Sequence, residues 1–67
     1  MMTIKELRLR LGVPQRVIAA ALQVDTATVS RWERGTRISR HFIPALAKVL
    51  QVDPKELEPF IYRRKLG

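Results

Sequence analysis

The fold of this protein is decided by one stretch of its sequence, QRVIAAALQVDTATVSRWERG at residues 15–35. Its first part predicts a short, tightly packed helix over residues 15–22, and the small side chain of Ala19 stands where a second helix would cross it. Asp25 is a good N-cap for that second helix, which we expect over residues 26–34. Two helices joined by a turn of three or four residues form a helix-turn-helix, so the stretch predicts this motif.

The two faces of this segment differ in chemistry. Apolar side chains fall at the internal positions and predict its packed side: Ile18, Leu22, Val24, Val29 and Trp32. Core packing is the expected role of Trp32, and a stacking platform for bases is the alternative. The outer face of the second helix carries small, polar or basic side chains: Thr26, Ala27, Ser30, Arg31 and Arg34. Such a face fits a DNA major groove about 12 Å wide and offers hydrogen bonds to base edges.

A helix and a loop flank the motif. Thr3 and Glu6 have the spacing of a capping box, which predicts a helix over residues 3–11 that ends at Gly12. Beyond the motif, residues 36–41 are polar and basic, and we expect them to form a loop.

Two more helices are expected after this loop. The fourth begins near Phe42 or Ile43, because Pro44 costs about 3 kcal/mol inside a helix but is tolerated in a first turn. Asp53 caps a short fifth helix, which Pro59 is expected to end. No strand pattern or internal repeat appears in the sequence. The predicted fold class is therefore all-α, a compact bundle of about five short helices.

The composition limits the classes of function. A chain of 67 residues is expected to form one small domain. It has no Cys and a single His, His41, which excludes a disulfide scaffold and a thiolate metal site and argues against a zinc site. The sequence lacks paired carboxylates in a plausible cleft, a nucleophile beside a histidine and a phosphate-cradling glycine loop. We therefore predict no enzyme activity, no metal and no cofactor.

The charge balance favours a polyanionic partner. Thirteen Lys and Arg against six Asp and Glu give a net charge of +7, and most of the cations are arginine. The arginine guanidinium can donate two parallel hydrogen bonds to a phosphate or to the edge of a guanine. The basic residues are not arrayed opposite a continuous apolar face, which argues against a membrane binder. With no signal peptide or membrane span visible, the expected location is cytoplasmic, at the nucleoid of a prokaryote or in the host cytoplasm for a phage protein.

One set of residues runs through the motif: Gln15, Ala19, Val24 and VSRWERG at residues 29–35. The set continues with Arg8 and Gly12 before the motif and with FIPALAKVLQVD at residues 42–53 after it. Together these residues resemble a known family, the Cro/C1-type helix-turn-helix found in the DNA-binding domain of lambdoid phage repressors. The span of the resemblance, about residues 3–58, implies a lambda-repressor-like domain with the helix-turn-helix at residues 15–34. The implied function is that of a sequence-specific transcriptional regulator, repressor-like in its action.

The resemblance also implies roles for individual residues. Bases are usually read from three positions, which here are Thr26, Ala27 and Arg31. Ser30 lies on the same face and is expected to contact bases as well. The positions where the DNA backbone is contacted are Gln15, Thr28, Arg34, Arg37 and Arg40, with His41 as an addition. Arg8 and Glu33 resemble a partly buried ion pair that ties the first helix to the third.

Three departures from the family pattern change what is expected here. Gln23 stands where the turn usually has Gly, so a non-glycine residue is expected to take a positive φ. Thr26 replaces the family's Gln with a shorter arm, and Ala27 offers only a methyl group, suited to a thymine methyl. Arg31 is therefore the strongest candidate for a specific base contact, most simply with guanine.

Partners and the C-terminal end follow from the same reasoning. Helix-turn-helix proteins generally bind as two-fold dimers, so we expect a homodimer on a pseudo-palindromic double-stranded operator. Residues 59–67 form a basic tail, in which Arg63, Arg64 and Lys65 follow an apolar stretch. That tail is a solvated end, a dimer patch or a segment that packs on the core. The alternative function is a protein-interaction module, such as an antitoxin-like or adaptor domain, motivated by the apolar part of the tail.

Overall fold

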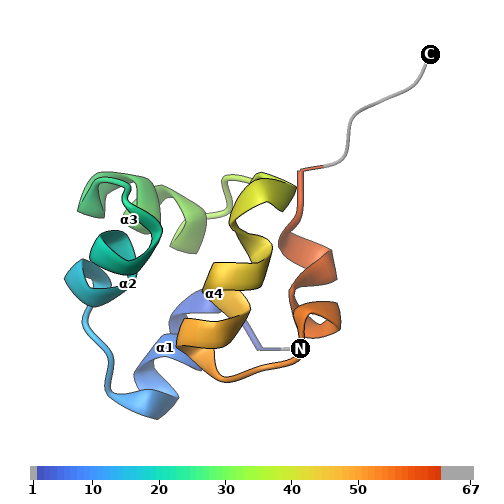
Figure 1. The fold of residues 1–67 in the computed structure, drawn as a ribbon, viewed down its shortest axis with the longest axis horizontal. Helices are drawn as coiled ribbons and strands as arrows, with labels where there is room; N and C mark the ends of the chain where they lie inside the picture. Colours follow the sequence, from blue (N-terminus) through green and yellow to red (C-terminus); the bar gives the residue numbers. More distant parts are fainter. Residues whose placement is uncertain (1, 63–67) are drawn as a thin grey trace.

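The computed structural model describes residues 2–62, so the basic run expected in the tail lies outside the described residues. Within that range the chain is helical, and the all-α prediction is confirmed. Figure 1 shows α4 at the centre, in contact with α2, with α1 and with the C-terminal 3-10 helix η2. The elements are α1 (Ile4–Leu11), α2 (Gln15–Leu22), α3 (Thr26–Glu33), η1 (Arg40–Phe42), α4 (Ile43–Leu50) and η2 (Pro54–Phe60).

The helices begin largely where the sequence places their caps. At α1 the capping box is complete, because Thr3 Oγ1 accepts from the Glu6 N–H at 3.1 Å and Glu6 Oε1 accepts from the Thr3 N–H at 2.8 Å. Asp53 caps η2 by accepting from the Lys55 N–H at 2.9 Å. Asp25 stands at the predicted N-cap of α3 with extended backbone, but its side chain makes no capping hydrogen bond. The start of α3 is therefore fixed by the backbone and by packing.

Left-handed residues end three of the α-helices. Gly12 follows α1 with φ 69°, Gln23 follows α2 with φ 57° and Gln51 follows α4 with φ 56°. Beyond α2 the N–H of Val24 bonds back to the Ala19 carbonyl at 2.9 Å. Such back-bonding satisfies carbonyls that the helix leaves open, which offsets the strain of a left-handed non-glycine residue. The positive φ predicted for Gln23 is confirmed, whereas that of Gln51 was not predicted.

Two expectations about the second half of the chain were wrong. The loop predicted at residues 36–41 is shorter, because Arg40–Phe42 form η1, whose first turn Ser39 caps by accepting from the His41 N–H. Pro59 does not end the last helix, because η2 runs through it to Phe60. The last turn is closed by the Ile61 N–H on the Glu58 carbonyl at 3.2 Å. Pro59 is the second residue of that turn, where its fixed φ is favourable and its missing N–H is not needed.

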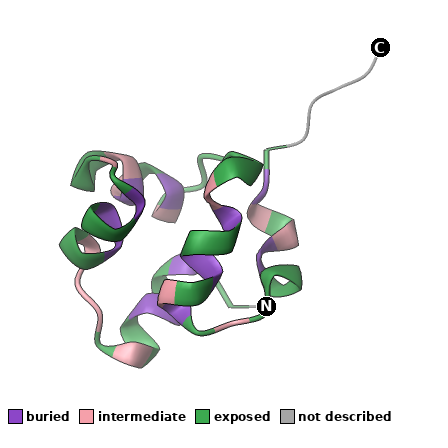
Figure 2. Cartoon of the chain, in the orientation of Figure 1, coloured by how far each residue is buried: buried purple, intermediate pink, exposed green. Residues whose placement is uncertain are grey.

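The core joins all the elements. The buried positions fall on the sides of the helices that face one another (Figure 2). The ring of Trp32 lies 5.4 Å from that of Phe42, between centroids, and this packing confirms the core role predicted for Trp32. The buried apolar residues are Ile4, Leu7, Ile18, Ala19, Leu22, Val29, Trp32, Ile38, Ile43, Leu46, Ala47, Leu50, Leu57 and Ile61.

Candidate nucleic-acid interface

Helix α3 divides into an inner and an outer face. Val29 is 0 % exposed and Trp32 is 7 % exposed, so these two side chains anchor the helix to the core. On the opposite side Thr26, Ala27 and Arg31 are exposed, and Ser30 is half-buried beside them. The structure thus places all four residues predicted to contact bases on the surface of one short helix. Their exposure leaves the side chains of Thr26, Ala27 and Arg31 available to a partner.

A buried polar cluster at the end of α3 holds the helix to the rest of the domain. Arg8 of α1 makes two parallel hydrogen bonds to Glu33, from Nε to Oε2 at 2.5 Å and from one terminal nitrogen to Oε1 at 3.1 Å. The other terminal nitrogen of Arg8 donates to the Val13 carbonyl at 3.1 Å. The side chains of Arg8 and Glu33 are only 11 % and 5 % exposed. A forked, partly dehydrated contact of this kind fixes both distance and angle.

Gln15 belongs to the same cluster. Its side-chain Nε2 donates to Glu33 Oε1 at 3.0 Å, which links the first residue of α2 to the last residue of α3. Burial raises the pKa of Glu33. The hydrogen bonds from Arg8 and Gln15 and the positive charges of Arg8 and Lys5 together lower it by more, so the net shift of the pKa is downward. The carboxylate therefore stays ionised, and three helices are joined at one charged atom group.

The residues predicted to contact the DNA backbone divide into two groups. Thr28 and Arg34 lie on or directly after α3, half-buried and exposed respectively. Arg37 lies beyond it, in the segment that leads to η1, and Arg40 is the first residue of η1. Among the described residues, the side chains of Arg31 and Arg34 have no hydrogen-bond or ion-pair partner.

The loop arginines, in contrast, have partners in the C-terminal segment. Arg37 donates a hydrogen bond to the Pro59 carbonyl. A terminal nitrogen of Arg40 lies 4.0 Å from Glu58 Oε1 in an exposed ion pair. His41 is exposed, and its ring stands edge-on to Phe42 at 5.1 Å between centroids. These partners were not predicted, because the sequence contains no local signal that brings residues 37–40 to residues 58–59.

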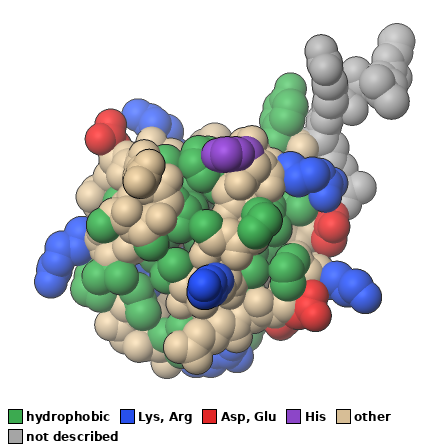
Figure 3. Space-filling model, in the orientation of Figure 1, with side chains coloured by type: hydrophobic (Ala, Val, Ile, Leu, Met, Phe, Trp, Pro, Cys, Tyr) green, Lys and Arg blue, Asp and Glu red, His purple; other side chains and the backbone are tan. Residues whose placement is uncertain are grey.

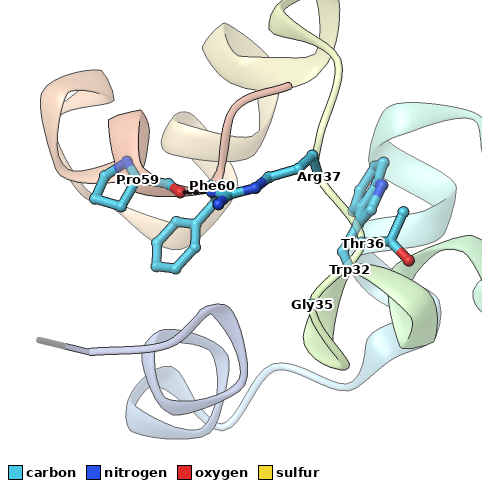
Figure 4. A pocket seen from close by; sticks show the side chains of 6 residues that line it. All are labelled: Trp32, Gly35, Thr36, Arg37, Pro59 and Phe60. Carbon is cyan, nitrogen blue, oxygen red and sulfur yellow. Dashed lines mark hydrogen bonds between the residues drawn. The ribbon is translucent and has the colours of Figure 1, made fainter. Parts of the chain in front are cut away.

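A shallow hollow of about 280 Å³ opens between the end of α3 and the C-terminal segment (Figure 4). The lining residues are Trp32, Gly35, Thr36, Arg37, Pro59 and Phe60. Figure 3 shows basic side chains spread over one face, with most of its acidic side chains on the side where η2 runs. Residues 53–58 carry three of the acidic residues of the chain, Asp53, Glu56 and Glu58. Negative charge is therefore concentrated in the C-terminal part of the bundle, in an element other than α3.

Other kinds of site were sought in the part of the chain that the structure describes. Across residues 2–62 no group of three or more His, Cys, Asp or Glu side chains is placed to hold a metal ion. No helix within the same residues is both long and apolar enough to cross a membrane.

Comparison with known proteins agrees with this geometry. The family model described as helix-turn-helix matches residues 4–57, which is most of the chain. Neither the curated proteins nor the solved structures gave a significant match. The chain therefore belongs to the Cro/C1-type helix-turn-helix family, a family of DNA-binding regulators.

Proposed function

We propose that this helix-turn-helix protein is a sequence-specific regulator of transcription, repressor-like in action, that places α3 in the major groove of double-stranded DNA. The observation that carries the proposal is the division of α3. Its inner residues and Glu33 are fixed in the domain, while Thr26, Ala27 and Arg31 face outward. A rigid helix with a small, polar and basic outer face presents its side chains to base edges at little entropic cost.

Within this proposal Arg31 is the main reader of sequence. Its exposed guanidinium has no partner among the described residues, so binding guanine breaks no contact that the fold needs. Arginine can donate two hydrogen bonds to the O6 and N7 atoms of guanine. Thr26, Ala27 and Ser30 contribute shorter contacts, with the Ala27 methyl directed at a thymine methyl.

Phosphate contacts supply most of the affinity in the proposed complex. Gln15 begins α2, Thr28 belongs to α3 and Arg34 directly follows it. Arg37, Arg40 and His41 come later in the chain. Neutralised phosphates release counterions, so affinity should fall steeply with salt. Two-fold symmetric binding follows the general behaviour of the motif, and we propose a homodimer on a pseudo-palindromic operator.

The test uses duplexes selected from a random pool, with scrambled duplexes as the reference, at several salt concentrations. Arg31→Ala should lower affinity for the selected site by about 1–3 kcal/mol and relax the preference at one base pair. Arg34→Ala should weaken selected and scrambled duplexes alike and reduce the salt slope by about 1. If the native chain prefers no duplex, the proposal is wrong.

The adaptor-like alternative depends on apolar surface in the C-terminal tail. Ile61 is buried in the core, and Tyr62 is the exposed aromatic residue that remains in the described part of this segment. One exposed tyrosine is a small surface for a protein partner, because stable interfaces bury about 800 Å² on each side. The observations therefore favour DNA as the main partner.

A further inference from the structure

The segment after η2 runs beside the loop that follows α3. The Ile38 N–H donates to the Phe60 carbonyl at 2.8 Å, and the Tyr62 N–H donates to the Ile38 carbonyl at 2.7 Å. These two bonds form a parallel bridge between Ile38 and Ile61, whose side chains are 0 % and 2 % exposed. Because both backbone groups of Ile38 are paired with this segment, the middle of the loop is fixed by residues more than twenty positions away.

The side chains on either side of this bridge connect the same two segments. Arg37 reaches from the loop across to the Pro59 carbonyl, above the ring of Phe60 (Figure 4). Arg40 lies near Glu58. Arg37 and Arg40 thus both meet the C-terminal segment, and the bond from Arg37 is made to a backbone atom that side-chain motion cannot displace.

We propose that residues 59–62 act as a positioning strap, which fixes residues 36–39, the loop before η1, and holds Arg37 in the orientation that binds a DNA phosphate. This inference rests on the proposed function, because it assigns the phosphate contact to Arg37. A guanidinium has five N–H donors, so the bond to Pro59 leaves donors for a phosphate. A side chain that is already held in place loses less conformational entropy when it binds, so its contact contributes more to affinity.

The strap therefore has a role beyond closing the core. Ile61 buries apolar surface and stabilises the domain, and a purely structural segment would need nothing more. The hydrogen bonds to Ile38 and Arg37 act on the loop instead, and they determine where its cations lie. Loosening the strap should consequently weaken DNA binding more than it weakens folding.

The test compares Pro59→Gly with Pro54→Gly in the full chain. Both prolines are exposed residues of η2, but only Pro59 lies in the strap, where its carbonyl accepts from Arg37. Pro59→Gly keeps that carbonyl but releases the fixed φ of the residue, so it loosens the strap backbone that positions it. Pro59→Gly should weaken binding of the selected duplex roughly threefold to tenfold, as expected when one long side chain loses its fixed conformation. The salt slope should stay unchanged, because no phosphate contact is removed. Pro54→Gly should lower thermal stability without weakening DNA binding.

A double-mutant cycle with Arg37→Gln isolates the role of Arg37. In the native background, Arg37→Gln should weaken binding and reduce the salt slope by about 0.9. In the Pro59→Gly background, the further loss of affinity should be less than half as large, because Arg37 is no longer held in place. Equal losses in both backgrounds would overturn the proposal, as would native affinity of a Pro59→Gly variant whose Ile38 amide exchanges faster than in the native chain.

Amide hydrogen exchange provides a readout that does not depend on DNA. Pro59→Gly, or the milder Ile61→Val if the first variant does not fold, should speed exchange at Ile38 and Tyr62 while leaving the amides of α4 protected. Unchanged exchange at Ile38 means that the strap does not fix the loop. If the native chain binds no duplex, the proposed DNA binding is wrong, and so is the proposal that the strap positions Arg37 for a phosphate. The two failures are thus distinguishable.

Discussion

The helix-turn-helix and the loop–strap region both bring arginine to the surface, but they hold it in different ways. In α3, Arg31 stands on a helix whose backbone bonds are internal, and its guanidinium is left without a partner among the described residues. In the loop, Arg37 stands on irregular backbone, and its guanidinium is bonded to the strap. The first region holds the backbone and leaves the side chain free, whereas the second uses the side chain to help hold the backbone.

The difference follows from where each region finds partners for its backbone groups. Each buried N–H and C=O must be paired, and a helix does this within a few residues. A loop has no such internal ladder, so Ile38 pairs with Phe60 and Tyr62 instead. Changes in the helix-turn-helix should therefore act through packing and charge, and changes in the loop through long-range contacts.

The largest effect is expected where three helices meet a buried charge. Glu33→Ala leaves Arg8 dehydrated and unpaired, and should lower the free energy of unfolding by about 3–5 kcal/mol in urea titrations. Replacing both partners, as in Arg8→Met with Glu33→Leu, should recover most of this loss because no charge remains stranded. The matched control is the ion pair between Arg40 of η1 and Glu58 of η2, whose side chains are 70 % and 44 % exposed. There Arg40→Ala should cost at most about 1 kcal/mol.

The next largest effect tests whether the strap belongs to the folding unit. Ile61→Ala removes a fully packed side chain and should lower the free energy of unfolding by about 2–5 kcal/mol. The neighbouring Tyr62 is 62 % exposed, so Tyr62→Ala should change stability by no more than about 0.5 kcal/mol. Equal losses for the two variants in thermal unfolding would mean that Ile61 is not packed as described.

A smaller effect is expected at the junction between α3 and the loop. Gly35 has φ 116°, which side-chain-bearing residues rarely adopt, although open space surrounds it. Gly35→Ala should therefore cost about 1–3 kcal/mol through backbone strain alone. Gly12 has φ 69°, within the left-handed region, so Gly12→Ala should cost less. Neither glycine is crowded, so the difference between the two losses of unfolding free energy, measured by chemical denaturation, reports backbone strain.

Acid should weaken the helix-turn-helix through Glu33. Its folded pKa lies below the ordinary value of 4.5, so its contribution to stability is complete above that value and is lost as the pH falls through the folded pKa. Hydrogen bonds from Thr3 lower the pKa of Glu6 in the same direction. Thermal unfolding between pH 7 and pH 3 should show a stability loss that Glu33→Gln reduces but does not abolish. A pH profile unchanged by Glu33→Gln would exclude this carboxylate as the source.

The smallest effect concerns the turn inside the helix-turn-helix. Gln23 has a positive φ that glycine adopts without strain, so Gln23→Gly should stabilise the domain by up to about 1 kcal/mol. The greater freedom of glycine in the unfolded chain offsets part of this gain. Gln51 has nearly the same backbone angles and serves as a second trial of the same effect. Destabilisation at both sites in matched melting curves would contradict the strain argument.

Much of the helix-turn-helix could be predicted because its signals are local. The span of α2 and the inward Val29 and Trp32 follow from neighbouring residues. The positive φ of Gln23 was implied by the family resemblance, in which glycine usually occupies that turn. Periodicity assigns a face and a turn fixes a direction, so the outward position of Arg31 needed no knowledge of the rest of the fold. The residues that DNA would meet on α3 were thus readable from about twenty positions.

Only the tertiary structure decided what the loop and the strap do. Nothing near Arg37 in the sequence indicates that its partner is the carbonyl of Pro59, because backbone carbonyls are the same in every residue. The burial of Ile61 and the helical turn through Pro59 depend likewise on contacts with Ile38 and on the bond between Glu58 and Ile61. Local patterns determine which face of a helix points outward, whereas the pairing of distant backbone groups is determined when the whole chain closes around one core.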